Sequence, residues 1–427
     1  MATGTEQAGL PAVHEAWLPR QHALHRPRHG GRQLTALLSA AIFFATPLVA
    51  LGLGIRPAEF ENRPLAGFPG LSQGWDFFAG LSPWATDHLV FRDGAISAAD
   101  AVSRGVFGEP PPFGERKQTA GPIQTERPRV ETNLYVPTII EGKAGWMYLG
   151  DEVLSHCKPN APLEGSFAQL RRLREGVEAS GRRFAFVVAP DKATVVPDYL
   201  PGGYPGNDCH RRAIDDLWRM VGDEPSAIDL RDELRAWGNR LGRPVYPPLD
   251  AHWTDEGGVL MARRVAEKLY PGVTGTWSVV PAGPWEAPAD LPPLIGRTGT
   301  VAGQRYAIKP DGVHDQTRDG PTDFNTQPLR LNSTSGKGTF AEKVGMYSDS
   351  FTIRALRYLA ASFSDISVLH YGQVQKDGGK AAGEYLASNS VVVIEVAERI
   401  LAAGNCAILD PRVVDGILEV LSRHPVR

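Results

Sequence analysis

Cysteine is scarce in this sequence of 427 residues, which contains only Cys157, Cys209 and Cys406. No two of them have Cys-x-x-Cys spacing, so neither a zinc ribbon nor a thioredoxin-like redox motif is predicted. A strong excess of one charge is also missing, because the formal net charge is -3 at pH 7. A basic surface for nucleic acid is therefore not expected. The hydrophobic content of 42% and the charged content of 22% are those of an ordinary globular protein.

Long uncharged segments are rare as well, and the clearest one lies near the N-terminus at 34–55. This run is long enough to cross a bilayer as a helix. Basic residues gather just before it, so the positive-inside rule places the tail, 1–33, in the cytoplasm and the chain after Arg56 outside. A cleaved signal peptide and a buried helix of a soluble domain are the alternatives. The pattern favours a signal-anchor, with the protein held in the cell membrane by this single helix.

The next segment, 56–132, is predicted to be a juxtamembrane helical region followed by a linker. A charged cluster that includes Asp87 and His88 is expected near the start of a helix, and it is interpreted as part of a salt-bridged helix. Prolines then accumulate between about 108 and 132, which is typical of a linker or a long loop.

From residue 133 to 427, short apolar runs alternate with amphipathic helical patterns. The runs 184–189, 366–370 and 391–396 are predicted to be strands, and a further short strand is expected near Val245 and Tyr246. This alternation predicts an α/β fold with a mostly parallel sheet and helices on both faces. The segment 273–342 is rich in Gly, Pro, Thr and Asp. We expect it to be an insertion of loops and short strands at the mouth of the site.

The segment 249–254 reads Leu-Asp-Ala-His-Trp-Thr and contains a compact acid–base pair. In an extended segment, residues i and i+2 point to the same side, so Asp250 can fix the tautomer of His252. The other ring nitrogen is then free to take a proton from a nucleophile. Trp253 is expected to anchor the segment in the core, and Thr254 to begin a helix. A surface hydrogen-bonded pair and half of a metal site remain as alternative interpretations.

A nucleophile for this pair is available at Ser350. The stretch 343–352 is predicted to form a strand, a sharp turn and a helix, which puts the Ser350 backbone N–H where it can stabilise an oxyanion. A nucleophilic serine needs a base within hydrogen-bond reach, and the base needs an acid to orient it. We therefore predict that Ser350, His252 and Asp250 are the nucleophile, the base and the orienting acid of one site. A helix cap is the structural alternative for Ser350.

Several segments, in this order, resemble the SGNH-hydrolase-like proteins of the alginate O-acetyltransferase AlgJ/AlgX type. They are 61–65 (ENRPL), 87–93 (DHLVFRD), 145–149 (GWMYL), 190–192 (PDK), 250–254 (DAHWT), 348–351 (SDSF) and 395–399 (EVAER). The resemblance covers about residues 56–425. It implies an SGNH-hydrolase-like fold in which the triad Ser350, His252 and Asp250 moves acetyl groups onto a polysaccharide. One departure is Ser348, where this family usually has Gly, because a Cβ at that position can crowd the turn or the oxyanion hole.

The resemblance also implies partners. The acceptor is expected to be an exported polysaccharide, and the donor a multipass membrane acyltransferase, because no acetyl-CoA motif is visible in the chain. No bound cofactor or metal is predicted. A glycan acetylesterase with the same triad, and a non-catalytic glycan-binding or assembly protein, are the alternatives.

The three cysteines allow one further prediction. A domain outside the cytoplasm permits disulfides, and Cys157 and Cys209 are the expected pair because both lie near predicted helix starts beside one strand. Cys406 lies in a later apolar stretch and is expected to be a buried free thiol.

Overall fold

The computed structural model describes residues 134–426 continuously, together with short stretches before them (17–19, 21–22, 31–55, 67–70, 74, 76–88, 98, 102 and 105). The described residues up to 88 belong to one compact unit and those from 98 onward to another. The predicted motif 61–65, the second part of the motif 87–93 and the proline-rich stretch 108–132 lie outside the described residues. So does most of the predicted tail, 1–33.

The described residues of the first unit form the helices α1 (Gly31–Gly52) and α2 (Asp76–Asp87). Helix α1 includes most of the uncharged run 34–55, and its apolar side chains Ile42 and Phe43 are exposed. Across all stretches that the structure describes, no helix is both long and apolar enough to cross a membrane. The membrane anchor therefore stays a prediction. Asp87 is the last residue of α2, and the residues just after His88, where the predicted helix would begin, lie outside the described residues.

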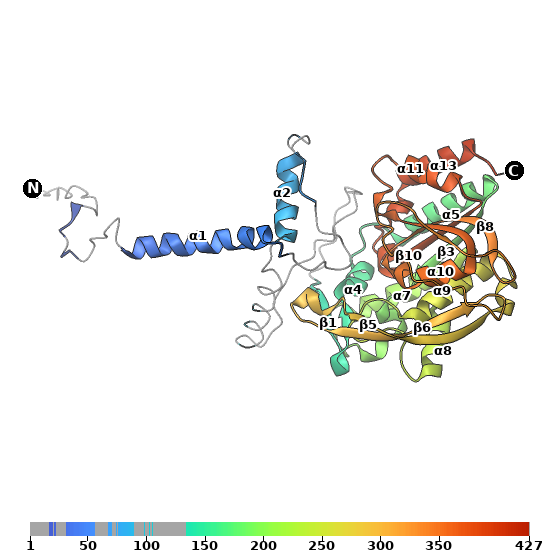
Figure 1. Ribbon diagram of the computed structural model, residues 1–427, viewed down its shortest axis with the longest axis horizontal. Helices are drawn as coiled ribbons and strands as arrows, with labels where there is room; N and C mark the ends of the chain where they lie inside the picture. Colours follow the sequence, from blue (N-terminus) through green and yellow to red (C-terminus); the bar gives the residue numbers. More distant parts are fainter. Residues whose placement is uncertain are drawn as a thin grey trace, which may run out of the picture. The chain divides into compact units, whose positions relative to one another are not determined.

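The second unit is built around a six-stranded sheet with the order β4-β3-β10-β8-β9-β7. Strands β3, β8 and β10 of this sheet are labelled in Figure 1. Its strands are β3 (Arg183–Ala189), β4 (Ala227–Asp229), β7 (Leu329–Asn332), β8 (Phe340–Ser348), β9 (Phe363–His370) and β10 (Val391–Ala397). The strands from β4 to β9 in this order run parallel, and β7 pairs antiparallel with β9 at the edge. The predicted mostly parallel sheet is confirmed.

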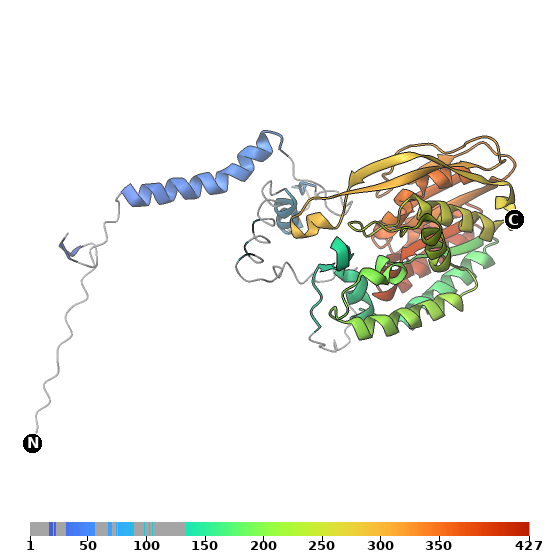
Figure 2. The same cartoon turned by 90° about the horizontal axis from the view of Figure 1, so that it is seen from below.

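Helices cover both faces of this sheet. One core contains residues of α8 (Arg231–Leu241), α9 (Asp255–Leu269) and α10 (Leu356–Ser362). The other contains residues of α5 (Leu163–Ala179), α7 (Asn207–Gly222), α11 (Lys380–Ala387) and α13 (Pro411–Arg423). Successive side chains of β3 alternate between the two cores, since Val187 belongs to the first and Phe186 and Val188 to the second. In Figure 2 the green helices α5 and α7 lie on the opposite side of the sheet from the yellow strands of the insertion.

The insertion 273–342 contains a long antiparallel pair, β5 (Ser278–Pro288) and β6 (Thr300–Lys309). The expectation of short strands is wrong for this pair, which spans 11 and 10 residues. Pro281 and Pro284 are tolerated because each strand of an isolated pair has one unpaired edge. Gly303 of β6 leaves room for the ring of Trp285, since a Cβ there would lie 2.5 Å from it.

The second unit also contains further short strands and helices. They are β1 (Ile139–Glu141), β2 (Met147–Leu149), α4 (Gly150–Cys157), α6 (Lys192–Val195) and α12 (Glu398–Ala402). The last residue of α4 is joined to the first turn of α7 by the disulfide Cys157–Cys209, with a Cα–Cα distance of 5.7 Å. This pairing confirms the prediction, although Cys157 ends its helix instead of starting it. Cys406 is buried and free, as expected.

The strand predicted at Val245 and Tyr246 is absent from the structure, and the described segment 243–254 is irregular. Proline has no N–H for a sheet ladder and its φ is fixed, so prolines prevent a strand here. The segment contains three of them, Pro244, Pro247 and Pro248. Both residues are nevertheless buried, with 1% exposure each. The apolar character of Val245 and Tyr246 thus predicted their burial correctly, but the strand predicted from it is wrong.

Candidate active site

The chain leaves the sheet at Ser348, the last residue of β8, and turns at Asp349 into a short 3-10 helix, η8 (Ser350–Arg354). The predicted strand, turn and helix are therefore present, with a 3-10 turn in place of the first α-helical turn. The Asp349 carboxylate accepts hydrogen bonds from three groups: Phe351 N (3.0 Å), Ala397 N (2.8 Å) and Tyr371 OH (3.0 Å). These bonds fix the turn that presents Ser350 against the end of β10.

Glu395 supports the same turn from β10. Its Oε2 accepts hydrogen bonds from Asp349 N and from Thr352 Oγ1, both at 3.0 Å. Burial and the neighbouring Asp349 raise the pKa of Glu395 well above its usual range. The backbone N–H of Ser350 finds no acceptor among the described residues, so it is available to an oxyanion. The side chain of Ser348 is fully buried and does not line the solvent-exposed side of the turn.

The structure brings the three predicted site residues together. His252 Nε2 lies 2.8 Å from Ser350 Oγ, and His252 Nδ1 lies 3.0 Å from Asp250 Oδ1. Asp250 and His252 meet through a turn and not along a strand, because the Asp250 carboxylate also accepts the His252 backbone N–H at 2.9 Å. A nucleophile, a base and an orienting acid are thus within hydrogen-bond reach of one another.

Trp253 anchors this loop, as the sequence predicts. It is 1% exposed, its Nε1–H donates to the carbonyl of Phe351 at 3.1 Å, and the two rings pack edge to face. Gly257 of α9 permits the packing, since a Cβ there would lie 2.3 Å from the Trp253 ring. Helix α9 begins after Thr254, as predicted, but the hydroxyl of Thr254 donates to Val245 O instead of capping the helix.

Lys192 holds the same loop from the end of β3. The ammonium group is fully buried and donates to three main-chain carbonyls: Pro247 (3.1 Å), Pro248 (3.1 Å) and Asp250 (2.8 Å). The aromatic rings of Trp146 and Tyr148 lie within 5.6 Å of Nζ and provide cation–π contacts. Burial lowers the pKa of Lys192 to about 8. At neutral pH the charged group therefore matches each of its three N–H bonds to one carbonyl of the loop.

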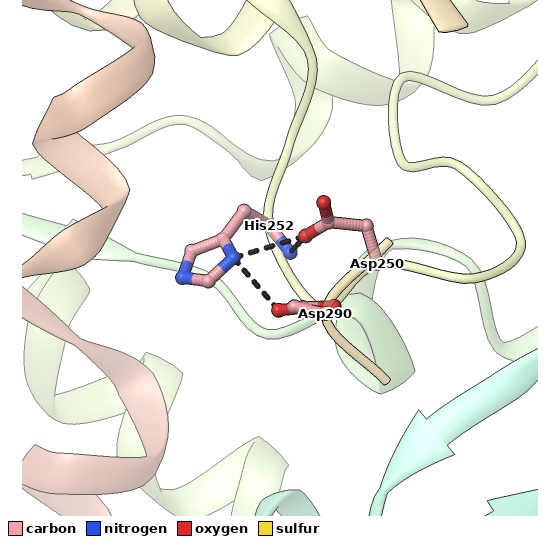
Figure 3. Close-up of side chains that lie close together, drawn as sticks. All are labelled: Asp250, His252 and Asp290. Atoms are coloured by element: carbon pink, nitrogen blue, oxygen red, sulfur yellow. Dashed lines mark hydrogen bonds and ion pairs between the residues drawn. The ribbon is translucent and has the colours of Figure 1, made fainter. Parts of the chain in front are cut away.

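A second carboxylate contacts His252, and sequence reasoning missed it. Asp290 follows β5 in the insertion, and its Oδ2 lies 3.1 Å from His252 Nδ1. Figure 3 shows Asp250 and Asp290 approaching the same ring nitrogen. No motif marks Asp290, and the only available signal was the expectation that the insertion borders the site. The side chains of Asp250, His252 and Asp290 are 10%, 15% and 19% exposed.

These contacts set the charge of the site. Burial lowers the pKa of His252, but the hydrogen bonds and negative charges of Asp250 and Asp290 outweigh burial and raise it to about 10. Burial raises the pKa of Asp250, and the contacts with His252 reverse this effect and lower it. The ligand atoms of the three side chains lie within 4.8 Å of one another, a spacing that a metal ion would also accept. Hydrogen bonds to Nδ1 account for the arrangement, and we assign no metal.

Beside η8 the described residues form a pocket of about 320 Å³. Its charged lining is mostly basic: Arg305, Arg318, Arg330, Arg354 and Arg357, against Asp255 and Asp319. Arg354 is the last residue of η8, which begins with Ser350. The Arg354 guanidinium also stacks over the Trp285 ring, with 3.8 Å between its Cζ and the ring centroid.

Comparison with known proteins gives a partial match. Residues 139–314 match the model of the family "SGNH hydrolase-like domain, acetyltransferase AlgX". A probable alginate O-acetylase AlgJ from Pseudomonas fluorescens is 25% identical over 134 residues, which cover 31% of this chain and 34% of that protein. The chain thus matches about a third of the length of this relative. The matched family segment includes Asp250, His252 and Asp290, while Ser350 lies beyond it.

Two solved structures align with part of this chain. The O-acetyltransferase domain of Pseudomonas putida AlgJ has a TM-score of 0.44 and 16% identity, covering 66% of this chain and 99% of that one. Pseudomonas aeruginosa AlgX has a TM-score of 0.39 and 12% identity, covering 63% of this chain and 67% of that one.

Proposed function

We propose that this chain, whose residues 139–314 match the model of an SGNH-hydrolase-like acetyltransferase domain, is an O-acetyltransferase acting on an exported polysaccharide. The observation that carries the proposal is the 2.8 Å contact between Ser350 Oγ and His252 Nε2. A serine in this position can pass its proton to the imidazole as it attacks an acyl group. Asp250, on the other ring nitrogen, holds the imidazole in the orientation that this transfer needs.

The first half of the reaction forms an acetyl-enzyme. Ser350 Oγ attacks the carbonyl carbon of the donor ester while its proton moves to His252 Nε2. The backbone N–H of Ser350 donates to the resulting oxyanion. When the tetrahedral intermediate collapses, the bond to the leaving group breaks and the leaving oxygen takes the proton from His252. The acetyl group is then an ester of Ser350.

The second half transfers the acetyl group to a sugar. A hydroxyl of the polysaccharide gives its proton to His252 Nε2 and attacks the acetyl carbonyl carbon. The new ester bond forms, the bond to Ser350 Oγ breaks, and Ser350 Oγ recovers the proton from His252. An acetylesterase would differ only in using water in place of the sugar hydroxyl.

The donor and the location are part of the same proposal. We place the chain in the cell membrane through residues 34–55, with the N-terminus in the cytoplasm and the catalytic domain outside. The support is the uncharged run after a basic flank and the exposed apolar side chains of α1. The disulfide Cys157–Cys209 fits an oxidising compartment. A multipass membrane acyltransferase would supply the acetyl group.

An acyl-transfer assay with the full chain in detergent tests the proposed function. The donor is 4-nitrophenyl acetate, and the acceptor is an acidic oligosaccharide, chosen because the pocket beside η8 is rich in arginine. Acetylated oligosaccharide in the mass spectrum supports a transferase. Release of acetate without acetylated oligosaccharide indicates an esterase, and no turnover with retained oligosaccharide binding indicates a non-catalytic protein.

The matched variants are Ser350→Ala and Ser388→Ala. Ser388 is an exposed serine at the end of α11 whose hydroxyl donates to Tyr385 O, far in sequence from the site residues. Ser350→Ala is expected to abolish transfer, and Ser388→Ala to leave it unchanged. Equal activity of the Ser350→Ala variant and the wild type would overturn the proposal.

A further inference from the structure

We propose that Asp290 is a positioning residue of the acyl transfer, because its carboxylate and that of Asp250 together hold the imidazole of His252 and couple it to the insertion 273–342. This inference rests on the proposed function and adds a residue outside the predicted triad. It also gives the insertion a role, since the insertion supplies one of the two carboxylates on the base.

Both oxygens of Asp290 are used at the site. Oδ2 lies 3.1 Å from His252 Nδ1, and Oδ1 accepts the backbone N–H of Ala251 at 3.0 Å. One carboxylate therefore binds two consecutive residues, one through the backbone and one through the ring. Asp250 makes the matching pair of contacts, to the backbone N–H and the ring of His252. Rotation of the ring would break contacts with both carboxylates.

The position of Asp290 is fixed by its neighbours. Ala289 N donates to Gly299 O at 3.0 Å, and Leu291 N donates to Leu249 O at 3.2 Å. Leu291 is 1% exposed and packs in one cluster with Ala251. The backbone on both sides of Asp290 is thus bound to its surroundings, and on the Leu291 side its partner is the loop that carries His252. This placement differs from that of an exposed aspartate that happens to lie near a histidine.

The charged groups around His252 define what Asp290 contributes. The carboxylates of Asp250 and Asp290 face Nδ1, and Ser350 faces Nε2. Two cations also interact with these carboxylates: Arg354 of η8 with Asp250, and Lys192 of α6 with both Asp250 and Asp290. Two carboxylates stabilise the imidazolium that forms when Ser350 gives up its proton. They also hold the pKa of the resting imidazole high, so the base becomes neutral only at elevated pH.

Replacing Asp290 by Asn is therefore expected to change the pKa of His252 in a definite direction. The variant keeps the shape of the side chain and removes its negative charge, so the His252 pKa falls by about 1 to 3 units. Because the base must be neutral to accept a proton, the acidic limb of the kcat/KM profile moves to lower pH by a similar amount. Asp290→Glu retains the negative charge, so its His252 pKa and its kcat/KM profile are expected to lie close to those of the wild type.

The test uses the full chain in detergent, with ¹⁵N-labelled histidine. The ring nitrogens of His252 are titrated by NMR in the wild type, in Asp290→Asn and in Asp290→Glu, and kcat/KM for 4-nitrophenyl acetate is measured against pH. Asp311→Asn is the matched control, because Asp311 lies in the same insertion and accepts from a histidine ring, that of the exposed His314, at 2.7 Å. This control is expected to leave His252 and the rate profile unchanged.

The NMR titration separates this inference from the proposed function, because it requires no turnover. A wild-type His252 that titrates near the ordinary value for histidine would overturn the inference even if Asp290→Asn fails to fold. An unchanged His252 titration in folded Asp290→Asn would overturn it as well. A high and Asp290-dependent titration without any turnover would support the double carboxylate contact and overturn the acyl transfer.

Discussion

Two segments meet at the site, and they are built in different ways. The nucleophile segment, 348–354, continues a central parallel strand and is fixed by hydrogen bonds of Asp349 and Glu395 close to the turn. The base segment, 243–254, has no regular secondary structure among its described residues. Contacts from distant parts of the chain hold it in place, among them Lys192 after β3 and Asp290 after β5. The nucleophile thus lies at a strand end that buried hydrogen bonds to Glu395, Ala397 and Tyr371 reinforce, whereas the base lies in a loop without regular secondary structure.

The two segments also differ in the polar contacts that stabilise them. Around the nucleophile segment, the Asp349 carboxylate is a local helix cap that satisfies nearby N–H groups. Around the base segment, a fully buried ammonium satisfies carbonyls of a proline-rich loop. Removing one partner of such a buried contact leaves polar groups without partners in the interior. The base segment is therefore expected to respond more strongly to changes outside it.

The largest expected effect tests whether the two segments act as one unit. Ser350→Ala and His252→Ala should each lower kcat/KM for an activated acetyl ester by roughly 10⁴-fold or more, and the double variant little further. Steady-state kinetics of the two single variants and the double variant give the comparison. Losses that multiply in the double variant would show that the two residues act independently.

The next effect concerns the anchor of the base segment. Trp253→Ala removes a fully buried ring and its hydrogen bond to Phe351, so the free energy of unfolding should fall by about 3–5 kcal/mol. Denaturant unfolding followed by fluorescence or circular dichroism measures this loss. A stability within about 1 kcal/mol of the wild type would mean that the loop does not depend on this anchor.

A smaller effect is expected for the buried lysine. Lys192→Met retains the length of the side chain and removes its donors, which leaves three loop carbonyls unsatisfied. We expect kcat/KM to fall by about 10²-fold as the loop moves Asp250 and His252 away from Ser350. Lys268→Met is the control, since Lys268 also donates to a proline carbonyl but is exposed. Equal kinetics for both variants would remove the proposed role of Lys192.

The smallest effect should fall on the nucleophile segment. Asp349→Asn retains one acceptor oxygen for the turn and loses the other, so stability should fall by about 1 kcal/mol. Asp377→Asn, at the start of α11, is the control, because Asp377 accepts from Gly379 N and Ala381 N on the surface. If Asp349→Asn destabilises the protein more than Lys192→Met does, the contrast between the two segments is wrong.

The sequence predicts the nucleophile segment well, because its features are local. An apolar run followed by Ser-Asp-Ser-Phe is a strand that turns into a helix, and the structure has that order. The contact of Asp250 with His252 is also local and could be predicted, although the route through a turn could not. Periodicity predicted a strand at Val245 and Tyr246, where prolines prevent one.

The contacts that place the base segment could not be predicted. Asp290 lies in a loop without a motif, and Lys192 looks like an ordinary surface lysine until its burial is known. Both depend on how distant segments fold together, which residue spacing does not encode. The resemblance to a family marked the segment that contains Lys192 without indicating what the side chain does.

The most direct test of the central claim is the intact mass of the protein after brief exposure to an activated acetyl ester. The triad predicts that the wild type gains one acetyl group, that peptide mapping places it on Ser350, and that His252→Ala acquires it far more slowly. The Ser388→Ala control should be acetylated on Ser350 like the wild type. An acetyl group on another residue, or full turnover by Ser350→Ala, would contradict the claim that Ser350, His252 and Asp250 carry out the reaction.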